Sequence, residues 1–181
     1  TNGPVPIWAT AAFPDHFFKQ YGLFRETESR RGAAQFGWHV DEGALACSAL
    51  GRRADIEGAA RVGVRLPTKT FSGEARFEIG GVEFQLHEAP GETHDQLFVW
   101  LPKYDTLLAG DNYYAAFPNL SSPAIGPRPV RRWIESLDRM LELDADHLVP
   151  SHTAPVSGRE QVRSTLTAYR DAGIDALFQA R

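Results

Sequence analysis

The sequence has only one cysteine, Cys47, among 181 residues, which excludes a disulfide within the chain and a metal site built from several thiolates. No apolar run approaches the ~20 residues that a membrane-spanning helix needs, so none is predicted. Basic residues are not in excess either, because 23 acidic side chains against 19 basic ones give a formal net charge of -4. Nucleic-acid binding depends on a basic surface, so nucleic acid is not an expected partner. A membrane is not expected either, because the sequence has no long apolar run.

What the sequence does contain is the composition of a globular domain. Hydrophobic residues make up 43% of the chain, enough for a core, and charged residues make up 23%. We therefore expect a single domain over residues 1–181, apparently truncated at both ends, because predicted secondary structure runs close to each end of the chain. Residues 1–10 show neither the basic start nor the apolar stretch of a signal peptide, and the localisation stays open between cytoplasm and periplasm.

The first half of the chain combines helical spacing with an irregular stretch. Apolar residues three to four apart from Phe13 to Phe24 predict a helix, continuous or broken, that extends to about Gln35. Residues 41–63 are rich in Gly, Ala and Arg with weak periodicity, and they predict a long loop.

Strands and helices alternate in the second half. Apolar residues alternate with polar ones on both sides of Gly80-Gly81, which predicts a β-hairpin. Further elements are predicted as follows: strands at 97–101 and 106–109, both buried on two faces, a helix at 130–141, a strand at 147–150, and a last helix that begins with a capping box at 157–160. This order predicts a layered α/β domain.

Three metal-capable side chains follow predicted strands or glycine turns. They are Glu92, in a turn after the hairpin, Asp111, after the strand at 106–109, and His152, after the strand at 147–150. Loops at the carboxyl ends of strands collect functional groups in such domains, so the three are expected to meet at one edge of the sheet. Carboxylate and imidazole suit zinc, manganese or iron, which lower the pKa of a bound water. Each residue alone has a structural alternative: a solvated carboxylate, a turn-forming aspartate and a structural histidine.

The segments that carry these residues are similar to a known family. Pro90-Gly91-Glu92-Thr93, Gly110-Asp111 and Ser151-His152 resemble the ligand-bearing turn and strand ends of metallo-β-lactamase-fold hydrolases. Glu92 stands where most of that superfamily has histidine, and glutamate there is a feature of its alkylsulfatase-like branch. The nineteen-residue spacing from Glu92 to Asp111 also resembles that branch.

The resemblance implies a fold, a reaction and a cofactor. The fold would be a layered αββα sandwich of which this chain holds the second half only. The reaction would be metal-dependent hydrolysis of alkyl or aryl sulfate esters by metal-activated water. Two zinc ions, or manganese or iron, would occupy the intact site. Glu92 would bind one ion, Asp111 would bridge both and His152 would bind the second, so that Asp111 and His152 take part in catalysis.

Residues near the ligands receive roles by the same resemblance. The side chains that would contact substrate are Asn112, Tyr113, Tyr114, Asn119 and Arg128. Arg128 is included because it is the nearest guanidinium where relatives carry an arginine soon after the position of Leu120, and a guanidinium can hold an oxyanion. His94 and Asp95, which lie beside Glu92 in the sequence, would orient its carboxylate for metal binding. Structural alternatives remain open: Asn112 as a turn former, the tyrosines as core residues, and His94 and Asp95 as a strand cap.

One departure from the family affects the expected partners. The superfamily's first metal motif, His-x-His-x-Asp-His, does not occur in this chain. We therefore expect a preceding segment or a second polypeptide to complete the metal site, with a small ester as substrate and a homodimer as a possible assembly. Two other functions stay open, a non-catalytic half-domain that docks to a partner and a metallo-hydrolase of phosphodiesters or lactones.

Overall fold

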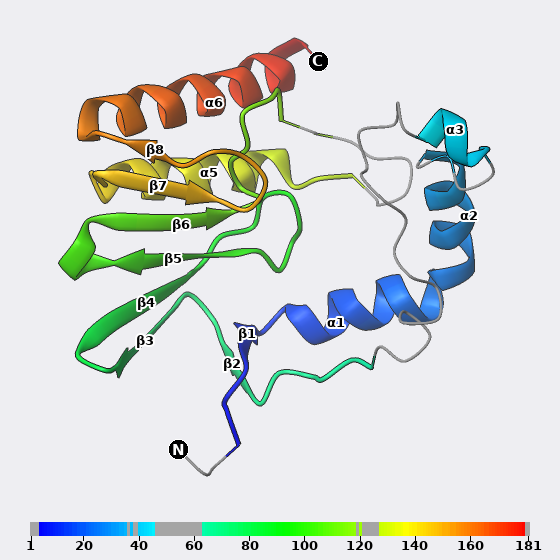
Figure 1. Cartoon of the computed structure of the whole chain (residues 1–181), viewed down its shortest axis with the longest axis horizontal. Helices are drawn as coiled ribbons and strands as arrows, with labels where there is room; N and C mark the ends of the chain where they lie inside the picture. Colours follow the sequence, from blue (N-terminus) through cyan, green and yellow to red (C-terminus); the bar gives the residue numbers. More distant parts are fainter. Residues whose placement is uncertain are drawn as a thin grey trace.

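The computed structural model describes residues 4–35, 37, 40–45, 63–118, 120 and 127–179 (Figure 1). Its strands are β1 (Trp8–Thr10), β2 (Lys69–Phe71), β3 (Glu74–Ile79), β4 (Val82–Glu88), β5 (Leu97–Leu101), β6 (Thr106–Gly110), β7 (His147–Pro150) and β8 (Val156–Ser157). Its helices are α1 (Phe13–Phe18), the π-helix η1 (Lys19–Leu23), α2 (Arg25–Gln35), α3 (Glu42–Leu45), the 3-10 helix η2 (Pro102–Tyr104), α5 (Val130–Glu142) and α6 (Arg159–Gln179). None of the helices in the described ranges is long and apolar enough to cross a membrane.

A six-stranded sheet forms the centre of the molecule, in the order β3-β4-β5-β6-β7-β8. Neighbouring strands are antiparallel except β6 and β7, which are parallel and are connected through α5. The predicted hairpin is confirmed: Ile79 pairs with Val82, and Gly80 and Gly81 have φ angles of 58° and 75°. Two consecutive positive φ angles are the geometry that a tight hairpin turn requires.

Helices α5 and α6 lie side by side against β7 and the neighbouring strands (Figure 1), and the core forms between helices and sheet. Apolar residues on the inner stripe of each element build it. Its largest fully buried side chains include Phe98, Leu107, Trp133, Met140, Leu148 and Leu166. The layered α/β class predicted from the sequence is confirmed.

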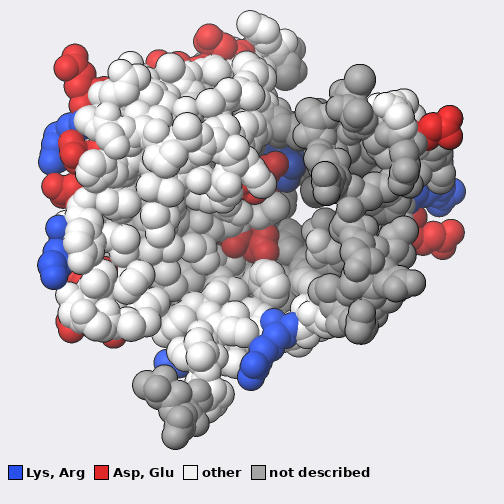
Figure 2. Space-filling view, viewed as in Figure 1, with Lys and Arg blue, Asp and Glu red and all other residues white. Residues whose placement is uncertain are grey.

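The prediction that β5 and β6 are buried on both faces is wrong. In β5, Phe98 and Trp100 are buried against the helices, whereas Leu97, Val99 and Leu101 on the other face are only half-buried. β6 alternates in the same way. Among the described elements α5 and α6 cover only one side of the sheet, so the continuous apolar sequence does not give continuous burial. Charged side chains are sparse over the broad face in Figure 2 and lie mostly at its edges.

The N-terminal region differs in detail from its prediction. The expected helix is present, but a π-helical turn at Lys19–Leu23 separates α1 from α2. The parallel pairing of β1 with β2 was not predicted, because the two strands lie far apart in the sequence. The predicted loop at 41–63 contains the short helix α3. The rest of that loop between 46 and 62, with Cys47, lies outside the described residues.

The last helix does not begin with the predicted capping box. Ser157 belongs to β8, and its hydroxyl lies 3.0 Å from Nδ1 of His147. The backbone N–H of Arg159 instead donates to Oδ1 of Asp146 at 3.1 Å. A carboxylate thirteen positions earlier in the chain therefore accepts a backbone N–H at the start of the helix. Local sequence spacing cannot reveal such a distant cap.

His87 in β4 makes stability depend on pH. Its ring stacks on Phe98 at 4.6 Å, and burial lowers its pKa below the ordinary value. Because the unfolded chain binds this proton more readily, we expect the free energy of unfolding to decrease as the pH falls below about 6.5, the unfolded pKa. Urea titrations between pH 7.5 and 5 measure this slope. His87→Phe should flatten it, and an unchanged slope in that variant would contradict the assignment.

Candidate functional site

Asp111 and His152 lie together at one edge of the sheet. They follow β6 and β7, which are parallel, so the carboxyl ends of both strands reach the same edge. A register shift between Leu108 and Gly110 disturbs the strand just before Asp111, as is common beside functional sites. Nε2 of His152 is 3.2 Å from Oδ1 of Asp111. His152 is 71% exposed, so its imidazole is open to solvent.

Asn112 connects the loop that carries Asp111 to the turn that carries Glu92. Its side chain is fully buried; Nδ2 donates to the carbonyl of Ala89 at 2.8 Å, and Oδ1 accepts the N–H of Glu92 at 3.3 Å. Its backbone carbonyl accepts Nε1–H of Trp133 at 3.0 Å. Both ends of the amide are therefore used, and these contacts favour the structural alternative for Asn112 over contact with substrate.

Glu92 is held by Arg128. Nη2 of Arg128 donates to Oε1 of Glu92 at 2.9 Å, and Nη1 donates to the backbone carbonyl of the same residue. The arginine side chain is 4% exposed and the glutamate side chain 20%. Two nitrogens of the predicted substrate-binding guanidinium are thus occupied by Glu92. That Arg128 contacts substrate stays a prediction.

The charged groups around Glu92 shift the pKa of its carboxyl. Burial raises the pKa of the Glu92 carboxyl above its ordinary value, although the guanidinium of Arg128 opposes the rise. The carboxylate of Asp111 raises the pKa further, and the imidazole of His152 lowers it. Both candidate ligands therefore act electrostatically on Glu92.

The donor set fits part of a metal site. Oδ1 of Asp111 is buried and has no hydrogen-bond partner among the described residues, since its approach to His152 lacks hydrogen-bond geometry. An unused carboxylate oxygen next to an imidazole nitrogen is suitable for a cation. In the described ranges, however, no group of three or more His, Cys, Asp or Glu could hold a metal ion. The structure brings Asp111 and His152 into contact, while the Glu92 carboxylate faces Arg128; the three-ligand site stays a prediction.

Tyr113 and Tyr114, two of the predicted substrate contacts, pack in or against the core. Tyr113 is 7% exposed and packs edge-on against Tyr169, with ring centroids 5.2 Å apart. Tyr114 also packs against Tyr169, at 5.8 Å. These contacts favour the core alternative for both tyrosines. Asn119, the remaining predicted substrate contact of this loop, lies outside the described residues.

His94 and Asp95 connect the Glu92 turn to the N-terminal elements. The ring of His94 stacks on His16 of α1, with centroids 5.0 Å apart and planes 3° from parallel. The backbone carbonyl of Asp95 accepts the hydroxyl of Thr10 at 2.9 Å. No local sequence pattern reveals this contact, because His16 and His94 lie far apart along the chain.

Residues 9–152 match the family model of the metallo-beta-lactamase superfamily, and the chain belongs to that superfamily. Within it, the chain is similar to alkylsulfatases, in agreement with the predicted branch. It is 31% identical to a linear primary-alkylsulfatase of Pseudomonas sp. (strain ATCC 19151), over 94% of this chain and 33% of that protein. It is 28% identical to an (R)-specific secondary-alkylsulfatase of Pseudomonas sp., over 93% of this chain and 26% of that protein. The chain therefore spans a third or less of these relatives.

Solved structures agree with this placement. A stereoselective inverting sec-alkylsulfatase from Pseudomonas sp. superposes with a TM-score of 0.79 at 26% identity, covering 92% of this chain and 27% of that one. A metallo-beta-lactamase family protein from Thermus thermophilus has a TM-score of 0.62 at 18% identity, over 97% of this chain and 53% of that one. The second likeness supports the fold alone.

Gly91 is expected to tolerate no side chain. A Cβ there would lie 2.0 Å from Oδ1 of Asn112 and 2.9 Å from Cδ1 of Trp133. Gly91→Ala should therefore lower the free energy of unfolding by about 1–3 kcal/mol, as overpacking does. Gly22→Ala is the control, because a Cβ at Gly22 meets nothing within 4 Å. Urea unfolding compares the two, and equal stability of both variants would contradict the close approach.

The Arg128–Glu92 pair is expected to couple strongly. Arg128→Ala and Glu92→Gln, alone and together, form a double-mutant cycle, which should give a coupling energy of about 1–2 kcal/mol. A smaller coupling is expected for the more exposed pair Arg170–Asp138, measured with Arg170→Ala and Asp138→Asn. Equal coupling in both cycles would mean that burial does not strengthen the Glu92 contact.

Proposed function

We propose that the protein is part of a metal-dependent hydrolase that cleaves sulfate esters, alkyl or aryl, with a metal-activated water. One observation carries the proposal: Asp111 and His152 lie 3.2 Å apart at the carboxyl edge of β6 and β7, with Glu92 electrostatically coupled to both. The superfamily membership and the two alkylsulfatases among its relatives support a hydrolase of this kind.

Residues of this chain would bind the metal and orient its ligands. Asp111 and His152 would hold a zinc ion, or manganese or iron, through Oδ1 and Nε2. Glu92 would be a further ligand, with the remaining ligands from a preceding segment or a second chain, and the two hydrogen bonds from Arg128 would fix its orientation and favour its ionised form. A bound cation at this place supplies Lewis-acid chemistry, which activates water and neutralises charge on the sulfate. The exposure of His152 leaves the substrate a direct approach.

A second candidate function is a half-domain that becomes active only with a partner. It is favoured by the lack, within the described ranges, of any third ligand grouped with Asp111 and His152. In that case a preceding segment or a second chain supplies the remaining ligands. The metal content of the purified chain separates the two: one or more zinc ions per chain, bound without a partner, would count against the half-domain.

His152→Ala should remove metal from the protein expressed from its complete coding sequence. The variant loses the only described imidazole that contacts Asp111, so we expect at least one bound ion fewer per chain and loss of sulfatase activity. Metal analysis by mass spectrometry measures the first effect independently of the second. His147→Ala is the control, since His147 contacts Ser157 and Asp146 away from this edge. Full metal content in His152→Ala would refute the proposed ligand.

The substrate class needs its own test. Aryl sulfate, aryl phosphodiester and lactone substrates should be compared on one metal-loaded preparation. We expect turnover of the sulfate ester, with alcohol and inorganic sulfate as products. Turnover confined to the phosphodiester or the lactone would keep the metal centre and replace the proposed substrate.

A further inference from the structure

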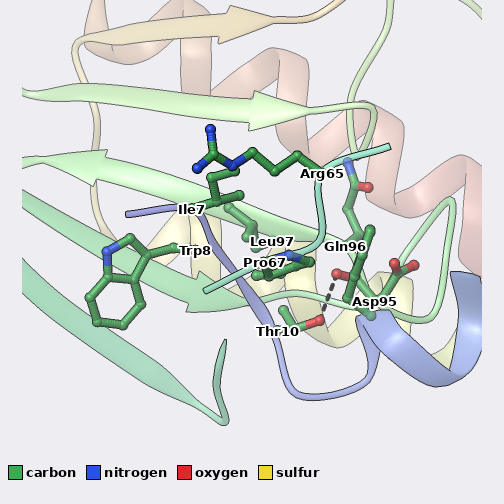
Figure 3. Close-up of a pocket in the computed structure, with 10 residues that line it drawn as sticks. Ile7, Trp8, Thr10, Arg65, Pro67, Asp95, Gln96 and Leu97 are labelled. Atoms are coloured by element: carbon green, nitrogen blue, oxygen red, sulfur yellow. Dashed lines mark hydrogen bonds between the residues drawn. The ribbon is translucent and has the colours of Figure 1, made fainter. Parts of the chain in front are cut away.

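Gln96 lies at the end of the turn that carries Glu92, next to the end of β6. Strands β5 and β6 are antiparallel, so the residue before Leu97 reaches the edge of the sheet where Gly110 and Asp111 lie. The side chain of Gln96 is half-buried, and it borders a cavity of about 370 Å³ that lies between β1 and the start of β5 (Figure 3). Gln96 therefore belongs to the same edge of the sheet as the proposed metal ligands.

The side chain of Gln96 lies against the residue before Asp111. Gly110 has a φ angle of 60°, and a Cβ there would lie 2.7 Å from Nε2 of Gln96 and 3.6 Å from the backbone oxygen of Leu97. The amide thus occupies the space that a side chain at Gly110 would need. The pairing of β6 with β7 is irregular here, with a register shift between Leu108 and Gly110, so the strand ladder restrains this point less than it does a regular strand. The packing of Gln96 adds a restraint at that point.

The amide oxygen of the same side chain contacts the Glu92 turn. Oε1 of Gln96 accepts the hydroxyl of Thr93 at the long distance of 3.4 Å. The backbone of Gln96 closes this turn as well, because its carbonyl accepts the N–H of Ala89 at 2.9 Å. Gln96 therefore connects the residue after Glu92 to the residue before Asp111.

Asn112 makes a comparable connection from the other side. It is buried beside Trp133 of α5, whereas Gln96 borders the cavity next to β1. Groups that hold metal ligands in place contribute to metal affinity although they do not touch the ion. We propose that Gln96 is a positioning residue, whose amide sets the separation of Glu92 and Asp111 for metal binding. The inference rests on the proposed metal site and adds to it a residue that contacts neither the ion nor the substrate.

Zinc affinity and the spectrum of the cobalt-loaded protein test this role in the product of the complete coding sequence. Gln96→Ala removes both side-chain contacts, so zinc binding should weaken by about tenfold or more. The visible absorption bands of bound cobalt(II) depend on ligand geometry, and they should shift in the same variant. Gln85→Ala is the matched control, because Gln85 pairs with Trp100 within the sheet and its amide donates to Glu83 at 2.9 Å. Both measurements should stay unchanged in the control.

A second variant separates the hydrogen bond from the packing. Gln96→Met fills the space beside Gly110 but cannot replace the oxygen that accepts the hydroxyl of Thr93, so it is expected to fold and still bind zinc less tightly than the unsubstituted protein. Thr93→Val removes the donor of the same bond. Adding Thr93→Val to Gln96→Met should therefore weaken zinc binding no further.

The outcomes separate the positioning role from the metal site beneath it. Full zinc affinity in Gln96→Met overturns the bridge to Thr93, and an unchanged cobalt spectrum in Gln96→Ala overturns the positioning of the ligands. An equal loss of zinc affinity in Gln85→Ala also overturns the role, because it shows a general effect on the sheet. Failure of the unsubstituted protein to bind zinc, or full metal content in His152→Ala, overturns the proposed metal site itself and the inference with it.

Discussion

The amide of Asn112 is the contact on which the geometry of the site depends. It bonds the chain before Glu92 through Ala89 and the N–H of Glu92 itself, and it directly follows Asp111. The buried indole of Trp133 fixes its backbone from α5. Buried polar groups of this kind are costly unless every bond is made, and here both ends of the amide are paired. Two loops that are distant in sequence are thereby kept in one relative position.

The parallel pairing of β6 and β7 provides the second constraint. Parallel neighbours need a long connection, and α5 supplies it while covering the sheet with Trp133, Leu137 and Met140. The same helix therefore closes the core and brings the ends of two strands to a common edge. Helix α5 thus packs against the core and also connects the two strands that precede Asp111 and His152. A change in the packing of α5 on the sheet would therefore displace Asp111 relative to His152.

Much of the fold could be predicted from the sequence. A strand that buries one face has apolar residues at every second position, and a helix that buries one face has them three to four positions apart. The hairpin at Gly80-Gly81 and the helix at Val130–Glu142 are examples. Of the site, the convergence of Asp111 and His152 followed from their places after strands. The hydrogen bonds from Arg128 to Glu92 could not be predicted in this way, since the two residues are thirty-six positions apart. Nor could the π-turn at Lys19–Leu23, which no apolar spacing distinguishes from an ordinary helix.

The edge of the sheet opposite the site is closed by its own set of contacts. The N–H groups of Asp146 and His147 both donate to the carbonyl of Asp105. The carboxylate of Asp146 accepts the N–H of Arg159, the first residue of α6. Strand β7 is thus anchored at its beginning, far from His152 at its other end. The loops that carry Asp111 and His152 can therefore lengthen or change sequence without shifting the register at the other end of the strands.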